Sequence, residues 1–248
     1  MSNLHDARQA LSTGDWPADA QALGRLLAGR YSCRGYRPEP VARETIERML
    51  QLAQLTASWC NSQPWQVLIT EGEGTERFRA ALFDQATADI GATRGAPASE
   101  PDFAFPAAYT GIYKDRQRDV GWQLYESVGV AYGDRVGSGV QMMKNFRLFD
   151  APHALIVTSE RDLGIYGAID CGLYVQALLL AAQSLGIGMI PQAALATYAP
   201  LIRDHFGLPE NRVVVLGCSF GYADDSHPAN RFRSRRAEIE SVVQWVGA

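Results

Sequence analysis

The sequence contains little lysine, few cysteines and no long hydrophobic run, and each shortage narrows what the protein can be. It has 248 residues, of which 47% are hydrophobic, 20% charged and 10% aromatic, and a formal net charge of −4. This composition is typical of a globular protein with a full core. The four cysteines lie far apart, and the four histidines show no His-x-His or His-x-x-x-His spacing. We therefore expect neither a disulfide scaffold nor a metal site.

No uninterrupted apolar run reaches the length of a membrane-spanning helix. The most apolar run, residues 177–182, lies between two glutamines and is far shorter than the ~20 residues that a membrane-spanning helix needs. The first residues also lack the basic segment followed by an apolar segment that is typical of a secretion signal. These observations predict a soluble, cytoplasmic protein that does not act at a membrane.

The shortage of lysine leaves the positive charge almost entirely to arginine. Only Lys114 and Lys144 are lysines among 23 basic residues, and seven of the 21 arginines fall within residues 30–37 and 231–236. A guanidinium group matches the geometry of a phosphate better than an ammonium does. Because the chain as a whole is acidic, the two clusters favour local binding of one small anion and argue against a nucleic acid partner.

The pattern of hydrophobic residues predicts an α+β protein with few strands and many helices. Helical spacing of apolar residues extends over residues 20–29 and 41–57, and compact strands are expected at 65–70, 153–158 and 212–217. Between Ile169 and Leu185 a helix is apolar nearly all round, which implies burial on more than one side and contact with another subunit. Nothing resembles a linker or a repeat, so residues 1–248 are expected to form a single domain.

Residues 101–149 differ from the rest in composition. Nine of the 24 aromatic residues lie there, and two interpretations stay open, because aromatic residues dominate cores and interfaces alike. The segment is either an excursion that covers a site or part of an ordinary core or dimer surface. On the first interpretation, Tyr113, Phe146 and Phe149 are candidates for stacking on a substrate.

Two short motifs suggest other functions, but their surroundings argue against both. Residues 217–221 match the Gly-x-Ser-x-Gly elbow of serine hydrolases and follow a predicted strand. The segment after Ser219 is turn-like and carries its acidic residues and His227 within a few positions, whereas the elbow leads into a helix. A hydrolase centred on Ser219 is a minor alternative. Residues 186–188 are better explained as a helix end than as a dinucleotide-binding loop, because position 191 is proline.

A third signal is spread over the whole chain. Arg30, Ser32 and Arg34 occupy alternate positions, so in an extended segment their side chains share one face and suit a phosphate with its adjoining polyol. Asn61 and Gln63, with Ser58 nearby, offer the donors and acceptors that match the edge of a heteroaromatic ring. Each segment alone also has a plain structural explanation, as solvated arginines or as a turn.

The order and spacing of these segments resemble the FMN-dependent nitroreductase family. Residues 30–36 resemble its Arg-x-Ser-x-Arg-x-Phe segment, 57–65 its Pro-Ser-x-x-Asn-x-Gln-Pro-Trp segment with alanine in place of proline, 186–194 its loop beneath the flavin, and 231–236 its basic C-terminal segment. Residues 170–176, 191–196 and 220–224 are most similar to the nitrobenzoate-reductase-like branch. The resemblance implies an α+β nitroreductase-like fold, with a central mostly antiparallel sheet flanked by helices, in an intertwined homodimer.

The resemblance also implies which residues bind FMN. One wall of the phosphate and ribityl site would be Arg30, Tyr31, Ser32 and Arg34, and the other Arg233 with Arg235 or, one residue on, Arg236. The partner chain would contribute Ser58, Trp59, Asn61 and Gln63. The flavin ring would lie against Pro191, Gln192 and Ala193, with a backbone N–H of Gln192 or Ala193 directed at the hydride-accepting nitrogen.

The implied activity is the reduction of a nitroaromatic or quinone-like acceptor by NAD(P)H through a ping-pong mechanism. The cofactor carries the chemistry, so we expect no catalytic histidine or cysteine. A related flavoprotein of the same fold, such as a dehalogenase or a dehydrogenase, is the alternative within the family.

Overall fold

The core of the fold is a four-stranded antiparallel sheet in the order β1-β2-β4-β3. The computed structural model describes residues 15–91 and 100–247. The strands are β1 (Gln66–Thr70), β2 (His153–Glu160), β3 (Gly188–Gln192) and β4 (Arg212–Gly221). The predicted α+β class, with a mostly antiparallel central sheet flanked by helices, is confirmed.

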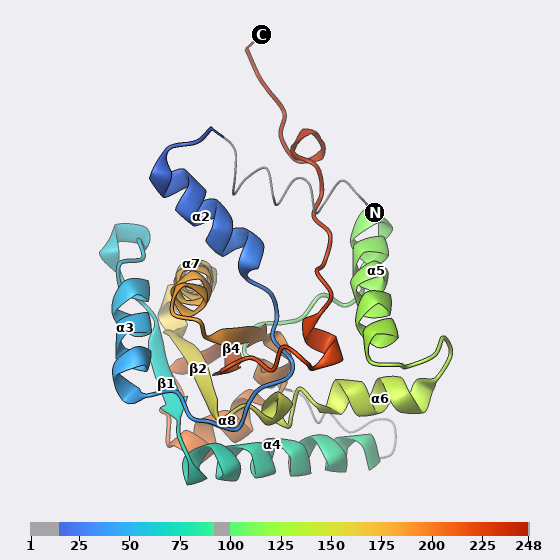
Figure 1. Ribbon diagram of the computed structural model, residues 1–248. Coiled ribbons are helices and arrows are strands. Elements are labelled where there is room, and N and C mark those ends of the chain that lie inside the picture. Colours follow the sequence, from blue (N-terminus) through green and yellow to red (C-terminus); the bar gives the residue numbers. More distant parts are fainter. Residues whose placement is uncertain (1–14, 92–99, 248) are drawn as a thin grey trace.

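Helices cover both faces of the sheet (Figure 1). The described α-helices are α2 (Ala18–Gly29), α3 (Arg43–Ala53), α4 (Glu73–Gly91), α5 (Gly111–Ser127), α6 (Arg135–Met143), α7 (Gly164–Ser184) and α8 (Ala199–Phe206). Short 3-10 turns are η1 (Trp59–Asn61), η2 (Leu148–Asp150), η3 (Arg161–Leu163), η4 (Ala193–Tyr198), η5 (Pro228–Asn230) and η6 (Ile239–Ser241).

The central strand β2 explains why the sheet has two covered faces. Leu155 and Val157 belong to the core shared with α3 and α7, whereas Ala154 and Ile156 belong to the core shared with α4 and α8. Successive side chains of a strand point to opposite faces. An uninterrupted apolar run is therefore what a strand buried on both sides requires.

Helix α7 is the apolar helix predicted at 169–185, and it begins earlier, at Gly164. It ends at Ser184. Gly186, just beyond the end, has a left-handed φ of 73°, and the N–H of Ile187 closes the last turn by donating to the carbonyl of Ala182 at 2.9 Å. Among the described residues, 161–184 form one helical segment that is long and apolar enough to cross a membrane, and half of it is buried in the fold. This pattern is typical of the core helix of a globular protein.

Two predicted boundaries were wrong in ways that affect the site. The loop expected at 186–194 contains strand β3, which pairs with β4 from Gly188 to Gln192. The strand expected to end at 217 continues to Gly221, because β3 and β2 pair with β4 on its two sides. Ser219 therefore lies inside a central strand.

Most of residues 101–149 lie outside the layered core and carry α5 and α6, which lie beside it in Figure 1. The segment rejoins the core at Phe146 and Leu148. Asp102 fastens the start of this excursion to the core. Its carboxylate accepts hydrogen bonds from Arg203 Nη1 at 2.5 Å and from the backbone N–H of Val214 at 2.7 Å. The excursion thus begins beside Val214 of strand β4.

Candidate functional site

The segment at residues 30–37 continues the sheet beyond the edge strand β3. Ser32 forms a parallel bridge with Met189, and the N–H of Cys33 donates to the carbonyl of Met189 at 3.3 Å. Cys33 is fully buried, and its Sγ would lie 2.9 Å from a Cβ on Gly188. Because Cys33 points into the fold, its neighbours Ser32 and Arg34 point outward, as their alternate positions predicted.

Both arginine clusters line one small pocket. The pocket has a volume of about 60 Å³. Its lining consists of Arg30, Tyr31, Ser32, Arg34, Val120, Phe232, Arg233, Ser234 and Arg236. Segments separated by nearly the whole sequence therefore form opposite walls of one site, as the resemblance implied.

Aromatic rings hold two of the arginines in place. The guanidinium carbon of Arg233 lies 3.9 Å from the centre of the Tyr31 ring. That of Arg34 lies 5.9 Å from the ring centres of both Phe149 and Phe232. Such contacts restrict a guanidinium group without using its hydrogen-bond donors, so these two side chains can still donate to a ligand.

The pocket is electrostatically suited to an anion. Four of the described lining residues are arginines and none is a carboxylate. Burial lowers the pKa of Arg34, which shows the cost of placing this charge away from water. Burial also raises the pKa of Tyr31 to about 12, so its hydroxyl remains a donor. A bound dianion would offset the repulsion among the four cations.

The structure places Arg236 in this pocket and Arg235 beside it. Arg235 forms an ion pair with Asp119 of α5, and the hydrogen bonds to Asp119 raise its pKa. Arg235 lines a neighbouring cavity of about 730 Å³ between α5 and the C-terminal segment, and Val120, Ser234 and Arg236 border both spaces. Of the two alternatives left open by the sequence, Arg236 fits the pocket geometry.

The start of β3 adjoins the segment that lines this pocket, because Ser32 pairs with Met189. Gln192 at the end of β3 is buried, Pro191 is half-buried and Ala193 is exposed. The amide of Gln192 is fixed at both ends: it accepts a hydrogen bond from Ser219 Oγ at 2.5 Å and donates to the carbonyl of Asn145 at 3.0 Å. This arrangement holds the backbone of residues 191–193.

The same network contradicts the hydrolase alternative. Ser219 is fully buried in β4, and its hydroxyl is committed to Gln192. His227 is the N-cap of η5, where its ring accepts a hydrogen bond from Ala229. A nucleophile must be reachable and must face a base, and Ser219 meets neither condition.

The structure does not bring residues 58–63 to the arginine pocket. They form a loop beside the N-terminal part of α7, on the other side of that helix from the C-terminal segment (Figure 1). Asn61 and Gln63 are exposed and Ser58 is half-buried. Asp170 of α7 anchors the loop by accepting from the N–H of Trp59 at 3.1 Å and from the hydroxyl of Ser62 at 3.3 Å.

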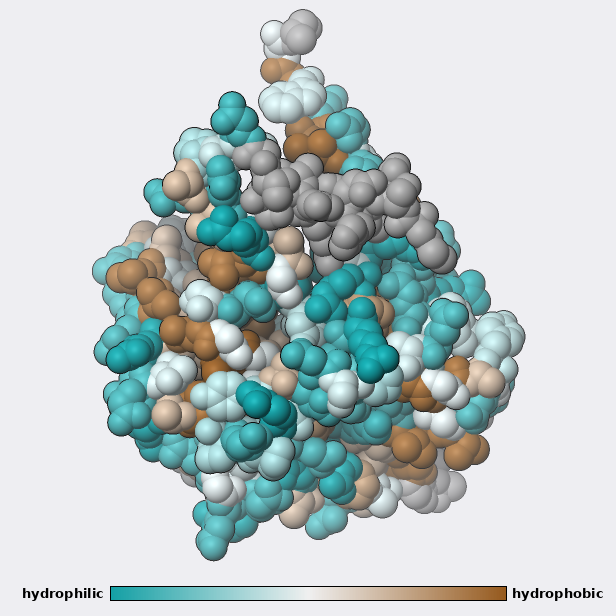
Figure 2. Space-filling view, viewed as in Figure 1, coloured by the Kyte–Doolittle hydropathy of each residue, from teal (hydrophilic) through white to brown (hydrophobic). Residues whose placement is uncertain are grey.

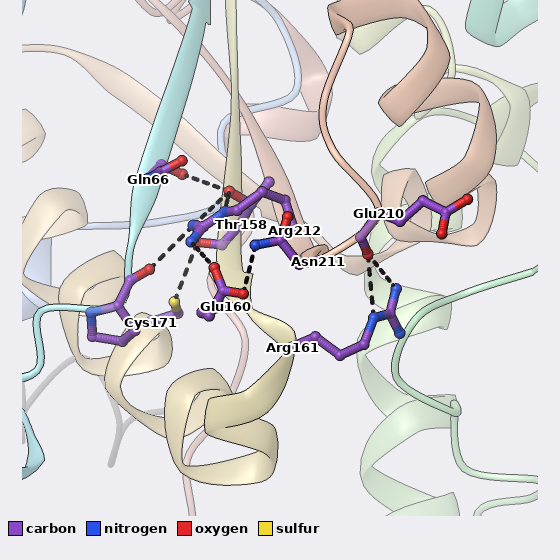
Figure 3. A network of polar contacts seen from close by, with 9 residues as sticks. Gln66, Thr158, Glu160, Arg161, Cys171, Glu210, Asn211 and Arg212 are labelled. Atoms are coloured by element: carbon purple, nitrogen blue, oxygen red, sulfur yellow. Dashed lines mark hydrogen bonds and ion pairs between the residues drawn. The ribbon is translucent and has the colours of Figure 1, made fainter.

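A buried polar network fixes the far end of this loop. Figure 3 shows Arg212 among Thr158, Glu160 and Cys171. The guanidinium of Arg212 donates to the carbonyl of Thr158 at 2.9 Å and to the carbonyl of Pro64 at 3.2 Å, and it pairs with Glu160 at 3.4 Å. Arg212 is therefore a structural arginine that ties Pro64 to the sheet.

Left-handed backbone outside glycine gathers at two places in the described chain. Positive φ angles occur at Cys60, Asn61 and Gln63 and at Leu148, Phe149 and Asp150. Such residues cost free energy and persist at functional sites that constrain them. One group lies in the 58–63 loop and the other contributes the ring beside Arg34.

The three candidate substrate residues have different surroundings. Tyr113 on α5 is 64% exposed. Phe146 is buried against Tyr198, with ring centres 5.3 Å apart, and this packing favours a structural role. Phe149 is also buried and contacts Arg34. Their assignment to the substrate stays a prediction.

Comparison with known proteins agrees with this geometry. Residues 27–222 match the model of the Nitroreductase family. The chain belongs to the nitroreductase family. Nitroreductase NfnB of Mycolicibacterium smegmatis is 33% identical over 95% of this chain and 97% of its own. The 4-nitrobenzoate reductase of Pseudomonas putida is 30% identical over 96% and 98%.

Solved structures of nitroreductases show the same fold. The FMN-dependent nitroreductase NfnB from Mycobacterium smegmatis, crystallised with NADPH, superimposes with a TM-score of 0.83 at 32% identity, covering 92% of this chain and 99% of that one. The FMN and NADPH-dependent nitroreductase NfnB from sphigopyxis sp. strain HMH superimposes with a TM-score of 0.82 at 31% identity, covering 90% of this chain and 98% of that one. The family resemblance is confirmed, and the similar relatives include 4-nitrobenzoate reductases.

Sequence reasoning missed three residues of this nitroreductase site. Phe232 lines the pocket, Asp119 pairs with Arg235, and Asn230 bonds to residues of both walls. The spacing of the arginines was the only sequence signal near them, because each acts through a contact with a distant segment.

Proposed function

We propose that this chain is an FMN-dependent oxidoreductase that uses NAD(P)H to reduce nitroaromatic or quinone-like acceptors. The observation that carries the proposal is the meeting of both arginine clusters in one pocket whose described lining has no carboxylate. The relatives named as nitroreductases and 4-nitrobenzoate reductases support this activity over a dehalogenase or a dehydrogenase. The neighbour crystallised with NADPH supports a nicotinamide donor.

The residues present fit FMN by the chemistry of their donors. Arg30, Arg34, Arg233 and Arg236 supply guanidinium groups for a phosphate, and Ser32 supplies a hydroxyl for the phosphate or the ribityl chain. The ring of Tyr31 packs against the guanidinium group of Arg233. Arg235 would act indirectly, by holding the C-terminal segment against α5.

When bound, FMN supplies the capacity to take up electrons from a nicotinamide and pass them to an acceptor. The protein's own part is to hold the cofactor and to present the backbone of Pro191, Gln192 and Ala193. Ser219 and Asn145 lock the Gln192 side chain, so this backbone is preorganised for the charge that the ring gains. No side-chain acid is required for this role.

A second copy of the chain would complete the site. Ile165, Ile169 and Leu173 form an apolar stripe on α7 and are 62%, 50% and 51% exposed. Figure 2 shows hydrophobic surface on the side where α2, α3 and α7 lie, and another patch near α6. Exposed apolar surface of this kind is typical of an interface. Pairing through α7 would let Ser58, Trp59, Asn61 and Gln63 reach the partner's flavin.

We expect one such FMN-binding domain per chain, with residues 101–149 covering the site, in a cytoplasmic homodimer. The contact of α5 with the C-terminal arginines supports a covering role for this excursion. We expect a small aromatic acceptor as the partner, and the acidic net charge argues against nucleic acid.

The decisive experiment is purification of the protein after expression. We expect a yellow protein that releases FMN on denaturation and loses its visible absorbance when NADH or NADPH is added without oxygen. Adding 4-nitrobenzoate or a quinone should restore the absorbance. A colourless protein that does not bind added FMN would contradict the proposal.

The dimer has its own test. Replacing Leu173 by glutamate should shift the protein from dimer to monomer in sedimentation and should weaken FMN binding, because the 58–63 loop of the partner is lost. A Leu173→Glu variant that stays dimeric would contradict pairing through α7.

A further inference from the structure

A single buried amide connects the two walls of the arginine pocket. Asn230 is 4% exposed and ends the turn η5, just before the C-terminal arginines begin. The turn itself is fixed, since the N–H of Asn230 donates to the carbonyl of His227 at 2.9 Å and the His227 ring caps Ala229. These hydrogen bonds within the turn fix the position of Asn230.

The side chain of Asn230 forms three hydrogen bonds, all with backbone groups. Its Oδ1 accepts from the N–H of Arg34 at 2.8 Å. Its Nδ2 donates to the carbonyl of Gly35 at 2.8 Å and to the carbonyl of Asp224 at 2.9 Å. Every strong hydrogen-bonding direction of the carboxamide except one acceptor position is therefore used.

The main chain of Asn230 supports the opposite wall. Its carbonyl accepts a hydrogen bond from Arg233 Nη1 at 2.6 Å, and the same guanidinium lies over the Tyr31 ring. One residue therefore bonds to Arg34 and to Arg233, although Arg34 and Asn230 are 196 positions apart.

The approach of the two segments also depends on the absence of a side chain at Gly35. A Cβ there would lie 2.2 Å from the Cγ of His227. Glycine lets the η5 turn come close enough for the amide of Asn230 to reach the backbone on both sides of the Arg34–Gly35 peptide bond. The local chemistry is specific, because only a primary amide offers one acceptor and two donors at this position.

We propose that Asn230 is a positioning residue that sets the spacing of the arginines for the phosphate of the flavin cofactor. The inference rests on the proposed function. Without the amide, residues 35–37 stay paired with residues 222–224 through the backbone. Arg34 then loses its direct hydrogen bond to the turn that precedes the C-terminal arginines, and the guanidinium groups are no longer held at a fixed spacing. Asn230 therefore governs selectivity for a phosphorylated flavin over riboflavin, which lacks the phosphate.

The test is the ratio of riboflavin to FMN dissociation constants, measured by flavin fluorescence on the wild-type apoprotein and on Asn230→Asp. Aspartate has the same shape but, when ionised, has no donor for the carbonyls of Gly35 and Asp224. We expect the FMN dissociation constant to rise at least tenfold at pH 8 while that of riboflavin changes less than threefold. Asn211→Asp is the matched control, since Asn211 is exposed and bonds to Glu160 at 2.7 Å, away from the pocket.

A pH series separates positioning from general destabilisation. A protonated aspartic acid regains a donor, so the ratio of variant to wild-type FMN dissociation constants should fall as the pH is lowered from 8 to 5. Normalising to the wild type removes the titration of the phosphate itself. Asn230→Ser, which keeps one hydroxyl donor, gives a second variant with an intermediate expected loss if the aspartate variant does not fold.

The outcomes are distinct. Equal losses of FMN and riboflavin affinity, or an unchanged FMN affinity in a folded variant, would overturn the role of Asn230. A pH-independent ratio would do the same. Failure of the wild-type protein to bind either flavin would instead overturn the proposed function.

Discussion

Arg34 is the arginine whose removal tests the anion pocket most directly. Its guanidinium carbon lies 5.9 Å from the ring centres of Phe149 and Phe232, and Arg34 lines the pocket. A hydrogen bond to a charged group contributes about 1.5–3 kcal/mol, and each 1.4 kcal/mol is tenfold in affinity. Replacing Arg34 by alanine should therefore weaken FMN binding by about 10- to 150-fold.

The same substitution has a separate effect on the free protein. Each cation–π contact contributes about 0.5–2 kcal/mol, and 1 kcal/mol corresponds to about 2–4 °C in Tm for a chain of this size. Because removing Arg34 also relieves its repulsion with the other pocket arginines, we expect Arg34→Ala to lower the Tm of the apoprotein by no more than a few degrees. The FMN affinity of Arg34→Lys should lie between those of the wild type and Arg34→Ala, because lysine keeps the charge but loses the planar guanidinium group.

Arg37 provides the matched control for this experiment. It belongs to the same arginine cluster, lies 5.1 Å from the centre of the Tyr222 ring, and pairs with Glu39 at 3.9 Å, but it lies outside the pocket. Titrating FMN fluorescence at fixed ionic strength should give Arg37→Ala an affinity within twofold of the wild type. An Arg34→Ala protein within threefold of the wild type, or an equal loss in both variants, would refute the phosphate role.

Three further predictions concern buried groups. Ser219→Ala should lower the free energy of unfolding by about 1–3 kcal/mol in urea titrations, because Gln192 Oε1 loses its donor. The wild-type protein should not react with a fluorophosphonate probe, and labelling at Ser219 would support the hydrolase alternative instead. Burial lowers the pKa of His153, so the stabilising effect of the neutral ring is complete above about pH 6.5 and is lost as the pH falls toward the lower folded-state pKa. The free energy of unfolding should therefore differ less between pH 8 and pH 5 in His153→Gln than in the wild type. Equal differences in the two proteins would contradict this assignment. Gly35→Ala should destabilise the protein by about 1–3 kcal/mol through overlap with His227, and adding His227→Ala should recover part of the loss in Tm; a purely additive double variant would argue against the overlap.

The elements whose hydrophobic pattern is local were well predicted. Apolar spacing identified α3 and α7, and the uninterrupted apolar run identified β2, because burial on both faces removes any alternation. Strand β3 was missed, since Gly188 and Pro191 weaken a strand pattern and its pairing with β4 and Ser32 is visible only in three dimensions.

The candidate site divides in the same way. The unusual excess of arginine over lysine and the order of the motifs were sufficient to predict the family and a phosphate site. Which arginine of the final pair enters the pocket was decided by Asp119, which draws Arg235 toward α5 and leaves Arg236 beside Arg233. The sequence could not show this, because Asp119 and Arg235 are 116 positions apart.

By itself the sequence determined the local chemistry of this protein: guanidinium groups and a hydroxyl in alternate positions, an apolar central helix, and the motifs of a nitroreductase. Only the tertiary structure decided which of these groups meet. It buried Ser219 and thereby removed a nucleophile, placed residues 58–63 apart from the arginines, and joined the two arginine segments through Asn230. The physical reason is that hydrogen bonds and ion pairs between distant segments depend on strand register and packing, which short-range sequence patterns do not encode.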